Sequence, residues 1–331
     1  MAKGKERLSI GTFFYWLRYR VGEYGLRGLV RLLPWIPYSV LTFIAAWSAR
    51  ITFAIWLKYP TRMEENLAAA MGKEIPTPEE RRAFALKAWK NLAHGALEAA
   101  VATFTRSEKI LSAVRIEGEK NLKEAFATGR GVVALSAHLG NFTMIGIILA
   151  AAGYPFHVVV KNPRDSRFAR LMDHYRAVVG IKSISSKPRN QAAREILKAL
   201  RKNEIVLLIA DEFKSGGVEV EFLGLKVFAQ RGPITLAMRA GAPLIPMFVT
   251  RDENNRLTLH IEPQLNLVQT GQVQDDVDAN VALFTSQLEM MVRRYPDQWT
   301  WLGFQQNGTR PRIKTGVSRS SVPKQPDPLA S

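Results

Sequence analysis

The chain has 331 residues, a length that accommodates one large α/β domain with appendages or two smaller domains. It carries 46 Lys and Arg against 29 Asp and Glu, a formal charge of +17, and 47% of its residues are hydrophobic, which excludes a disordered or acidic protein. No cysteine occurs, so disulfide frameworks, thiolate zinc sites, iron–sulfur clusters and cysteine nucleophiles are excluded as well.

The positive charge is concentrated at the two ends of the chain. Residues 1–62 contain ten basic residues against two acidic ones, and residues 305–331 contain five against one. Nucleic acid and an acidic membrane surface are the usual partners of such segments. No nucleic-acid-binding module is recognisable, and the N-terminal bases flank apolar, Trp-rich sequence. We therefore expect anionic membrane lipid, and no nucleic acid, as the partner.

The N-terminal segment contains an unusually apolar stretch, in which Arg50 is the one charge between residues 32 and 57. A stretch of this length is long enough to span a bilayer, but a charge near its middle costs about 3 kcal/mol on insertion. Its prolines and tryptophans favour a helix in the membrane interface, so we predict a monotopic, helical membrane anchor over residues 1–62. The alternatives are a single-pass span and a buried hydrophobic helix pair of a soluble enzyme.

Residues 63–304 have the pattern of a globular α/β domain, and residues 305–331, rich in Gly, Ser, Pro, Lys and Arg, are predicted to form a disordered basic tail. Thr77, Pro78 and Glu80 form a capping-box sequence that predicts a helix from Pro78 to about Thr105. Short apolar runs then alternate with helical patterns, which predicts a mostly parallel central sheet flanked by helices. The predicted strands are 131–137, 156–160, 205–210, 244–249 and 257–261. The predicted helices are 142–152, 166–179, 191–202, 233–240 and 275–294.

The best candidate for a catalytic side chain is His138. It follows the apolar run 131–137, at the carboxyl end of a predicted strand, where open α/β sheets collect their ligands. Histidine is the usual general base at neutral pH, although position alone leaves a structural histidine equally open. His94 and Glu98 lie four residues apart without a third metal ligand, so we expect a hydrogen bond there and no metal site. Neither a dinucleotide-binding loop nor a Walker sequence occurs.

The sequence Ser136-Ala-His-Leu-Gly-Asn-Phe142 resembles the His-x-Gly-Asn-aromatic motif of the lipid A late acyltransferases and of the related phosphatidylinositol mannoside acyltransferases. Both belong to the lysophospholipid acyltransferase superfamily. The similarity covers most of residues 30–303, and the ordered set of short matches is specific although each piece is weak. The matching pieces are Asn66-Leu67, Lys161-Asn162-Pro163, the helix through Arg170, Arg176 and Gly180, Ala210-Asp211, Phe222-Leu223-Gly224, Arg231-Gly232-Pro233, Ala237, Gly241 to Pro246 and Tyr295 to Trp301.

This resemblance implies transfer of a fatty acyl chain to a hydroxyl of a lipid or glycolipid acceptor, with His138 as general base. The acyl donor would be a thioester of acyl carrier protein or coenzyme A, used as co-substrate with no further cofactor. The expected location is the cytoplasmic face of a bacterial inner membrane. The residues expected to bind substrate, chiefly through phosphate groups, are Asn141, Lys161, Arg164, Arg176 and Arg231. For Lys161 and Arg164, solvated charges at helix ends are an equally open interpretation.

The sequence departs from the family motif five positions after the histidine, where the family has Asp or Glu and this chain has Thr143. Three explanations stay open at this point. Asp211 or Glu212, at the end of the predicted strand 205–210, replaces the missing carboxylate. Alternatively, Thr143 itself orients the imidazole, or the protein has kept the fold and lipid binding with lost or altered chemistry.

Overall fold

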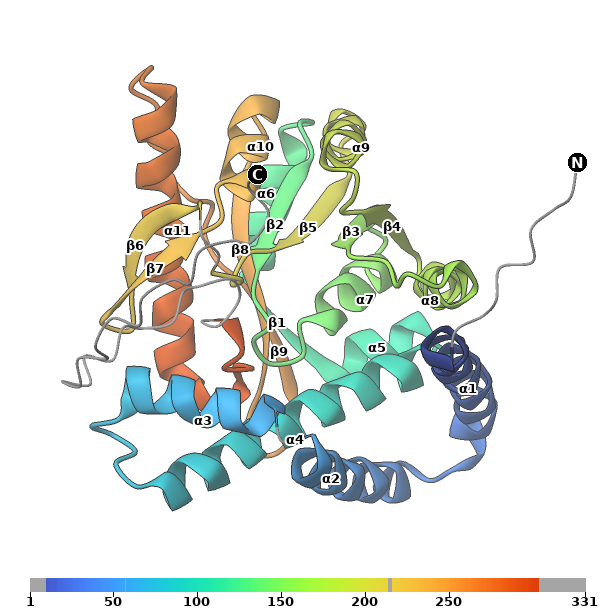
Figure 1. Cartoon of the computed structure of the whole chain (residues 1–331). Helices are drawn as coiled ribbons and strands as arrows, with labels where there is room; N and C mark the ends of the chain where they lie inside the picture. The colour runs from blue at the N-terminus through green and yellow to red at the C-terminus, as the bar shows by residue number, and fades with distance from the viewer. Residues whose placement is uncertain (1–9, 57, 214–215, 304–331) are drawn as a thin grey trace, which may run out of the picture.

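The computed structural model of the protein describes residues 10–56, 58–213 and 216–303. In this part of the chain, a seven-stranded and mostly parallel sheet is flanked by helices (Figure 1). The predicted α/β class is therefore confirmed. The predicted tail, 305–331, lies outside the described residues.

The elements follow one another along the chain with the following bounds. The helices are α1 (Ile10–Leu32), η1 (Leu33–Trp35), α2 (Tyr38–Ile55), α3 (Lys58–Met71), α4 (Pro78–Ala102), α5 (Ser107–Ala113), α6 (Glu119–Ala127), α7 (Thr143–Ala151), α8 (Ser166–Val178), α9 (Arg189–Arg201), α10 (Gly232–Ala240), α11 (Val273–Arg294) and η2 (Pro296–Gln298). The strands are β1 (Val114–Glu117), β2 (Val132–Ser136), β3 (Phe156–Val160), β4 (Ile181–Ser185), β5 (Ile205–Ile209), β6 (Val218–Phe222), β7 (Leu225–Ala229), β8 (Leu244–Arg251) and β9 (Leu257–Ile261).

The strands of the main sheet lie in the order β1-β9-β8-β2-β5-β3-β4. All neighbouring pairs in it are parallel except β8 and β9, which are antiparallel. Parallel neighbours end at the same edge of the sheet, so β2, β5, β3, β4 and β8 all deliver their carboxyl ends to one edge. That edge is where the candidate site lies.

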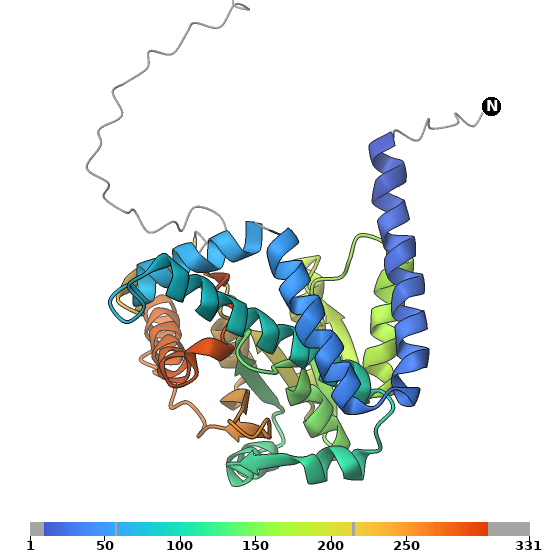
Figure 2. The ribbon, with the colours of Figure 1, turned by 90° about the horizontal axis from the view of Figure 1, so that it is seen from below.

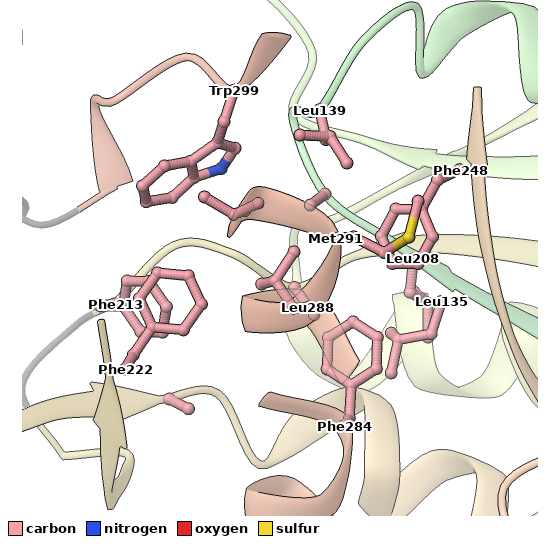
Figure 3. Packing of buried hydrophobic residues seen from close by; sticks show 14 of the residues in the cluster. Leu135, Leu139, Leu208, Phe213, Phe222, Phe248, Phe284, Leu288, Met291 and Trp299 are labelled. Carbon is pink, nitrogen blue, oxygen red and sulfur yellow. The ribbon is translucent and has the colours of Figure 1, made fainter. Parts of the chain in front are cut away.

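The central strands are buried on both faces, as expected for a parallel sheet covered by helices. In β2, Val133 and Leu135 pack into one hydrophobic cluster with residues of α9, α10 and α11, while Val132 and Ala134 pack into a second cluster with residues of α5, α6 and α7. Figure 3 shows the first cluster, in which the ring of Phe284 and the side chain of Leu135 come together. The two clusters hold the sheet, and with it the strand ends, in place.

Most predicted elements are present within a residue or two of their predicted bounds. The capping box opens α4 as expected, because Thr77 Oγ1 accepts from the Glu80 amide and the Glu80 carboxylate accepts from the Thr77 amide, both at 3.2 Å. The helix ends at Ala102, three residues before the predicted end. Strand β4 and the β6–β7 hairpin were not predicted. β4 reads Ile-Lys-Ser-Ile-Ser at a sheet edge, and β7 reads Leu-Lys-Val-Phe-Ala without a clear alternation.

Helices α2 and α3 lie across the body of the protein, whereas α1 runs beside α8 and its first half projects past the body (Figure 2). Helix α2 packs one face on α4 through Leu41, Ala49 and Phe53. It is long and apolar enough to cross a membrane by length and composition, which is weak evidence for a membrane segment. The predicted division of the chain at residue 62 falls inside α3 and stays a prediction.

Candidate active site

Strand register places His138 beside Asp211. β2 and β5 are parallel neighbours in which Ser136 lies opposite Ile209, and the amide of Ala210 donates to the carbonyl of Ser136 at 2.9 Å. His138 lies two residues beyond Ser136, and Asp211 lies two residues beyond Ile209. The continued register therefore brings the two side chains together at the carboxyl edge. The imidazole Nδ1 and Asp211 Oδ1 are 2.8 Å apart.

Asp211 is held by three hydrogen bonds and is 1% exposed. Besides the imidazole Nδ1, the backbone amide of His138 donates to Oδ2 at 2.9 Å, and the indole Nε1 of Trp299 donates to Oδ2 at 2.8 Å. Burial alone would raise the pKa of the Asp211 carboxyl, but the charge of the His138 ring and these hydrogen bonds outweigh it and hold the pKa below its ordinary value. The carboxyl is therefore ionised at neutral pH.

This geometry sets the tautomer of the imidazole. An ionised carboxylate only accepts hydrogen bonds, so the proton of a neutral His138 lies on Nδ1. Nε2 is then the basic nitrogen of the ring. The His138 side chain is 35% exposed, and its ring meets the ring of Phe142 edge-on at a centroid distance of 4.9 Å. A half-exposed base on a fully buried carboxylate is suited to moving protons to and from a ligand.

The backbone after His138 is fixed by two other segments. The amide of Gly140 donates to the carbonyl of Gln298 at 2.8 Å, and the amide of Thr300 donates to the carbonyl of His138 at 3.2 Å. Gly140 has a φ of +56°, and a Cβ there would lie 1.9 Å from the Val249 carbonyl oxygen. Only glycine fits this close approach, which explains the Gly of the motif.

A second polar network lies behind the loop. The Asn141 side chain is 4% exposed; its amide Nδ2 donates to Glu98 Oε2 at 2.8 Å, and its Oδ1 accepts from the Thr143 hydroxyl at 2.7 Å. Glu98 Oε2 also forms an ion pair with Arg251. Asn141, expected to bind substrate, is thus engaged by protein groups, and Thr143 bonds to Asn141.

The network extends to the first turn of α2. The Tyr38 hydroxyl donates to Glu98 Oε1 at 3.2 Å and lies 3.2 Å from His94 Nε2. Burial and the nearby Glu98 charge raise the pKa of Tyr38 to about 12, so the phenol stays protonated and can donate. His94 and Glu98, 4.0 Å apart, are thus joined through Tyr38. Within residues 10–56, 58–213 and 216–303, no group of three His, Asp or Glu side chains is placed to hold a metal.

The predicted basic residues do not all gather at the carboxyl edge. Lys161 and Arg164 are exposed in the loop that follows β3, at the same edge as His138. Arg176 is in the last turn of α8, which leads back to the amino edge of the sheet, and it pairs with Asp173 at 2.9 Å. Arg231 precedes α10 and pairs with Asp278 of α11 at 3.3 Å.

Of the two acids proposed to replace the motif carboxylate, Asp211 is the one whose hydrogen bond to the imidazole the structure shows. Glu212 is half-buried, and its carbonyl accepts from the Gln230 side chain at 3.1 Å. Trp299, Arg251 and Tyr38 also belong to the site and were not predicted to do so. Trp299 lies in the matched segment Tyr295 to Trp301, which was the available signal, whereas nothing in the sequence marks Arg251 or Tyr38.

The site thus consists of a buried carboxylate that orients a half-exposed imidazole at the carboxyl edge of an α/β sheet, the edge where such sheets collect their ligands. The family model for bacterial lipid A biosynthesis acyltransferases matches residues 14–306. The chain therefore belongs to that family, which acts on lipids or glycolipids. The suspected resemblance is confirmed.

Individual relatives agree with this assignment. A phosphatidylinositol mannoside acyltransferase of Mycolicibacterium smegmatis is 25% identical over 246 residues, which are 73% of this chain and 78% of that protein. The protein of the same name from Mycobacterium tuberculosis is 27% identical over 248 residues, 67% of this chain and 77% of that protein. A lipid A biosynthesis acyltransferase of Haemophilus influenzae is 24% identical over 188 residues, 56% of each chain.

Proposed function

We propose that the protein transfers a fatty acyl chain from an acyl thioester to a hydroxyl group of a membrane lipid or glycolipid, with His138 as general base. The observation that carries the proposal is the hydrogen bond between the His138 ring and the buried Asp211 carboxylate. The family assignment supplies the class of reaction, and the His138–Asp211 pair supplies the base that such a reaction needs.

In the first step, Nε2 of His138 takes the proton of the acceptor hydroxyl as its oxygen attacks the thioester carbonyl carbon. The C–O bond forms, and the imidazole becomes an imidazolium. Asp211 stabilises this cation because its carboxylate is ionised and 2.8 Å from Nδ1. When the tetrahedral intermediate collapses, the C–S bond breaks and the imidazolium returns its proton to the departing thiolate, so the base is regenerated without a covalent acyl-enzyme.

Glu98, Asn141 and Arg251 serve this reaction as positioning residues. Their network lies behind the loop, and Asn141 is only three residues from His138. The loop backbone is held at the same time by the amide of Asn141, which donates to the Val249 carbonyl at 2.9 Å. A fixed loop keeps the basic nitrogen at one place relative to the acceptor hydroxyl. Such fixed positioning favours proton transfer more than a flexible loop would.

The thioester is proposed to be carried by acyl carrier protein or by coenzyme A. Both donors present a phosphate group next to the pantetheine arm. Lys161 and Arg164 are exposed beside the carboxyl edge, and the segment 161–164 contains no acidic residue. The two side chains are therefore suited to contact such a phosphate. Arg231 contributes to the same surface only in part, because Asp278 neutralises it.

We also propose that α2 holds the protein on the cytoplasmic face of a bacterial inner membrane as a monotopic anchor. Its outer face is apolar and exposed: Phe43 is 62% and Trp47 51% exposed, and Val40, Ile44, Ile51 and Ile55 share that side at helical spacing. Because the opposite face packs on α4, the helix can lie in the interface without leaving the body. Arg50, also exposed, can reach the headgroups.

The test of the reaction is detection of the product by mass spectrometry. The full-length protein is incubated with a bacterial lipid extract and a mixture of acyl-carrier-protein and acyl-coenzyme A thioesters, and compared with the His138→Ala variant. A new acylated lipid that forms with wild type, and about 10²- to 10⁴-fold more slowly with the variant, is the expected result. Equal rates in both proteins would remove His138 from the reaction, and lipid binding without any product would favour a non-catalytic lipid-binding protein. Thermal unfolding of both proteins controls for folding.

A further inference from the structure

A cleft between α1 and α8 is lined mainly by basic side chains. The two helices lie side by side in both views (Figure 1, Figure 2), and the cleft has a volume of about 230 Å³. The α8 residues that line it follow one another at helical spacing, so they share one face of the helix. The lining residues are Glu23, Arg27, Arg167, Arg170, Leu171 and His174.

A buried carboxylate organises the basic groups. Glu23 has no exposed surface, and its Oε1 accepts from Arg27 at 3.0 Å and from Arg167 at 3.4 Å. Its Oε2 pairs with Arg20, which also pairs with Asp165, the buried N-cap of α8. Each guanidinium carries five N–H donors, and two carboxylates accept only part of them.

The cluster keeps an excess of positive charge. The guanidiniums of Arg20, Arg27 and Arg167 pair with the two carboxylates of Glu23 and Asp165, and Arg170 adds a fourth positive charge to the lining of the cleft. The next acid along α8, Asp173, is paired with Arg176. Arg170 is exposed and has no ion pair within the part of the chain that the structure describes. The cleft is therefore complementary to an anion that carries two negative charges.

We propose that this cleft binds a phosphate group. Its volume is below the about 300–1,000 Å³ of pockets that enclose a drug-sized ligand, so a headgroup-sized anion fits and a nucleotide does not. Guanidinium groups match the oxygens of a phosphate in two-point hydrogen bonds, and the cleft has them on both sides, Arg27 on α1 and Arg167 and Arg170 on α8. The exposed Arg170 is the guanidinium that completes the site.

The phosphate can come from a lipid headgroup or from a free anion. The last turn of α1, next to Arg27, exposes Leu29 and Leu32, and the chain continues to Trp35, which is 86% exposed. A lipid would thus place its phosphate in the cleft and its chains on this apolar surface. The site acts independently of acyl transfer, so its occupancy does not require His138.

Isothermal titration calorimetry of the full-length protein in uncharged detergent tests the proposal. The probes are dihexanoyl phosphatidic acid, dihexanoyl phosphatidylcholine and inorganic phosphate. We expect saturable binding of phosphatidic acid that weakens about tenfold or more in Arg170→Gln and recovers only in part in Arg170→Lys, which keeps the charge but loses the two-point geometry. The matched control is Arg194→Gln, an exposed arginine of α9, which should bind like wild type. His138→Ala should also bind like wild type, which separates this site from the proposed reaction.

The other probes decide the source of the phosphate. If inorganic phosphate competes and binds as tightly as phosphatidic acid, the site recognises a free anion; if only the lipid binds, the headgroup is the ligand. Identical affinities in Arg170→Gln and Arg194→Gln would overturn the proposal. So would phosphatidylcholine that binds as tightly as phosphatidic acid, or the absence of saturable binding to any probe.

Discussion

The carboxyl edge of the sheet buries polar side chains, whereas helix α2 exposes apolar ones. At the edge, Asp211 and Asn141 are almost completely buried, and each is hydrogen-bonded to several partners. On α2, Phe43 and Trp47 are more than half exposed. Buried, fully paired polar groups fix geometry for chemistry, whereas exposed aromatic side chains favour contact with an apolar medium. In the proposed function, reaction and docking therefore belong to different parts of the molecule, and each should be open to disruption alone.

The largest effect is expected from Asp211→Asn. An amide cannot stabilise the imidazolium and donates as well as accepts, so the wrong tautomer of His138 is favoured. Turnover should fall about 10²- to 10⁴-fold, by analogy with the same change in a Ser-His-Asp triad. Glu212→Gln is the matched control and should retain wild-type turnover. The turnover of both variants is measured from initial rates of acyl transfer. An equal loss of turnover in the two variants would contradict the assignment of Asp211.

Docking should be broken by charges on α2. In the double variant Phe43→Glu and Trp47→Glu, two aromatic side chains no longer enter the interface, and each contributes roughly 1.5–3 kcal/mol when buried. Partitioning to anionic vesicles in a flotation assay should fall about a hundredfold or more. Met290→Glu, a change of an exposed residue on α11, is the control and should float like wild type. Unchanged flotation of the double variant would show that another surface docks the protein.

A smaller effect is expected from Glu98→Gln, because Glu98 contacts Asn141 and Arg251 and acts on the proposed reaction only through them. The variant keeps the size of the side chain but loses the charge that pairs with Arg251 and holds Asn141. We expect kcat to fall about tenfold with little change in KM, because the loop is displaced rather than the substrate surface. A rise in KM with kcat unchanged would show that Glu98 contributes to binding instead.

Asp276 is a buried carboxylate that, unlike Asp211, contacts no residue of the candidate site within the described residues. Asp276, buried near the start of α11, accepts from the Thr270 amide and hydroxyl and from the Gly271 amide at 2.7–3.1 Å. The Thr270 amide first, and then the other donors, lower the pKa of Asp276 against the opposing effect of burial. Its stabilisation is therefore present above about pH 3.9, the ordinary value of an aspartate, and is lost as the pH falls through the lower folded value.

The expected consequence for Asp276→Asn is a change in stability without a change in turnover. The guanidinium chloride midpoint should be lower than that of wild type at pH 7, and the difference should narrow at pH 3. Turnover at pH 7 should stay within about twofold of wild type, because no contact joins Asp276 to the site residues in the described part of the chain. A constant difference across the pH range would mean that the charge of Asp276 does not matter.

Much of the sheet was predictable because its central strands are apolar runs buried on both faces. Asp211 was a candidate because it follows the predicted strand 205–210, and the observed register shows that this strand is adjacent to the one that precedes His138. Arg251 could not be predicted, because it meets Glu98 across 153 residues and no local pattern encodes such a contact. Trp299 lies in the matched segment Tyr295 to Trp301, but that match does not reveal its hydrogen bond to Asp211, 88 residues away. The β6–β7 hairpin was missed although β6, Val-Glu-Val-Glu-Phe, has the apolar and charged alternation of a half-buried strand; β7, Leu-Lys-Val-Phe-Ala, lacks that alternation.

The N-terminal helices show a different limit of sequence reasoning. Composition identified the apolar stretch, but it is equally apolar all round, so the face that packs on α4 and the face that is exposed could not be told apart. The partner of each face is decided by tertiary contacts such as the hydrogen bond from the Trp89 indole to the Thr52 hydroxyl, 3.0 Å long. The polar link from Tyr38 to Glu98 was hidden for the same reason.

The hydrogen bonds from the segment 298–300 to the loop of His138 also fix the order of events during synthesis. The ribosome releases His138 and Asp211 long before Trp299. The Asp211 carboxylate receives its third donor, and the Gly140 amide and the His138 carbonyl receive their backbone partners, only from that late segment. Domains fold from the N-terminus as they emerge, so the sheet can assemble while its catalytic loop is still loose. The His138 loop and the Asp211 carboxylate therefore gain their full set of hydrogen bonds only when nearly the whole described length has been made.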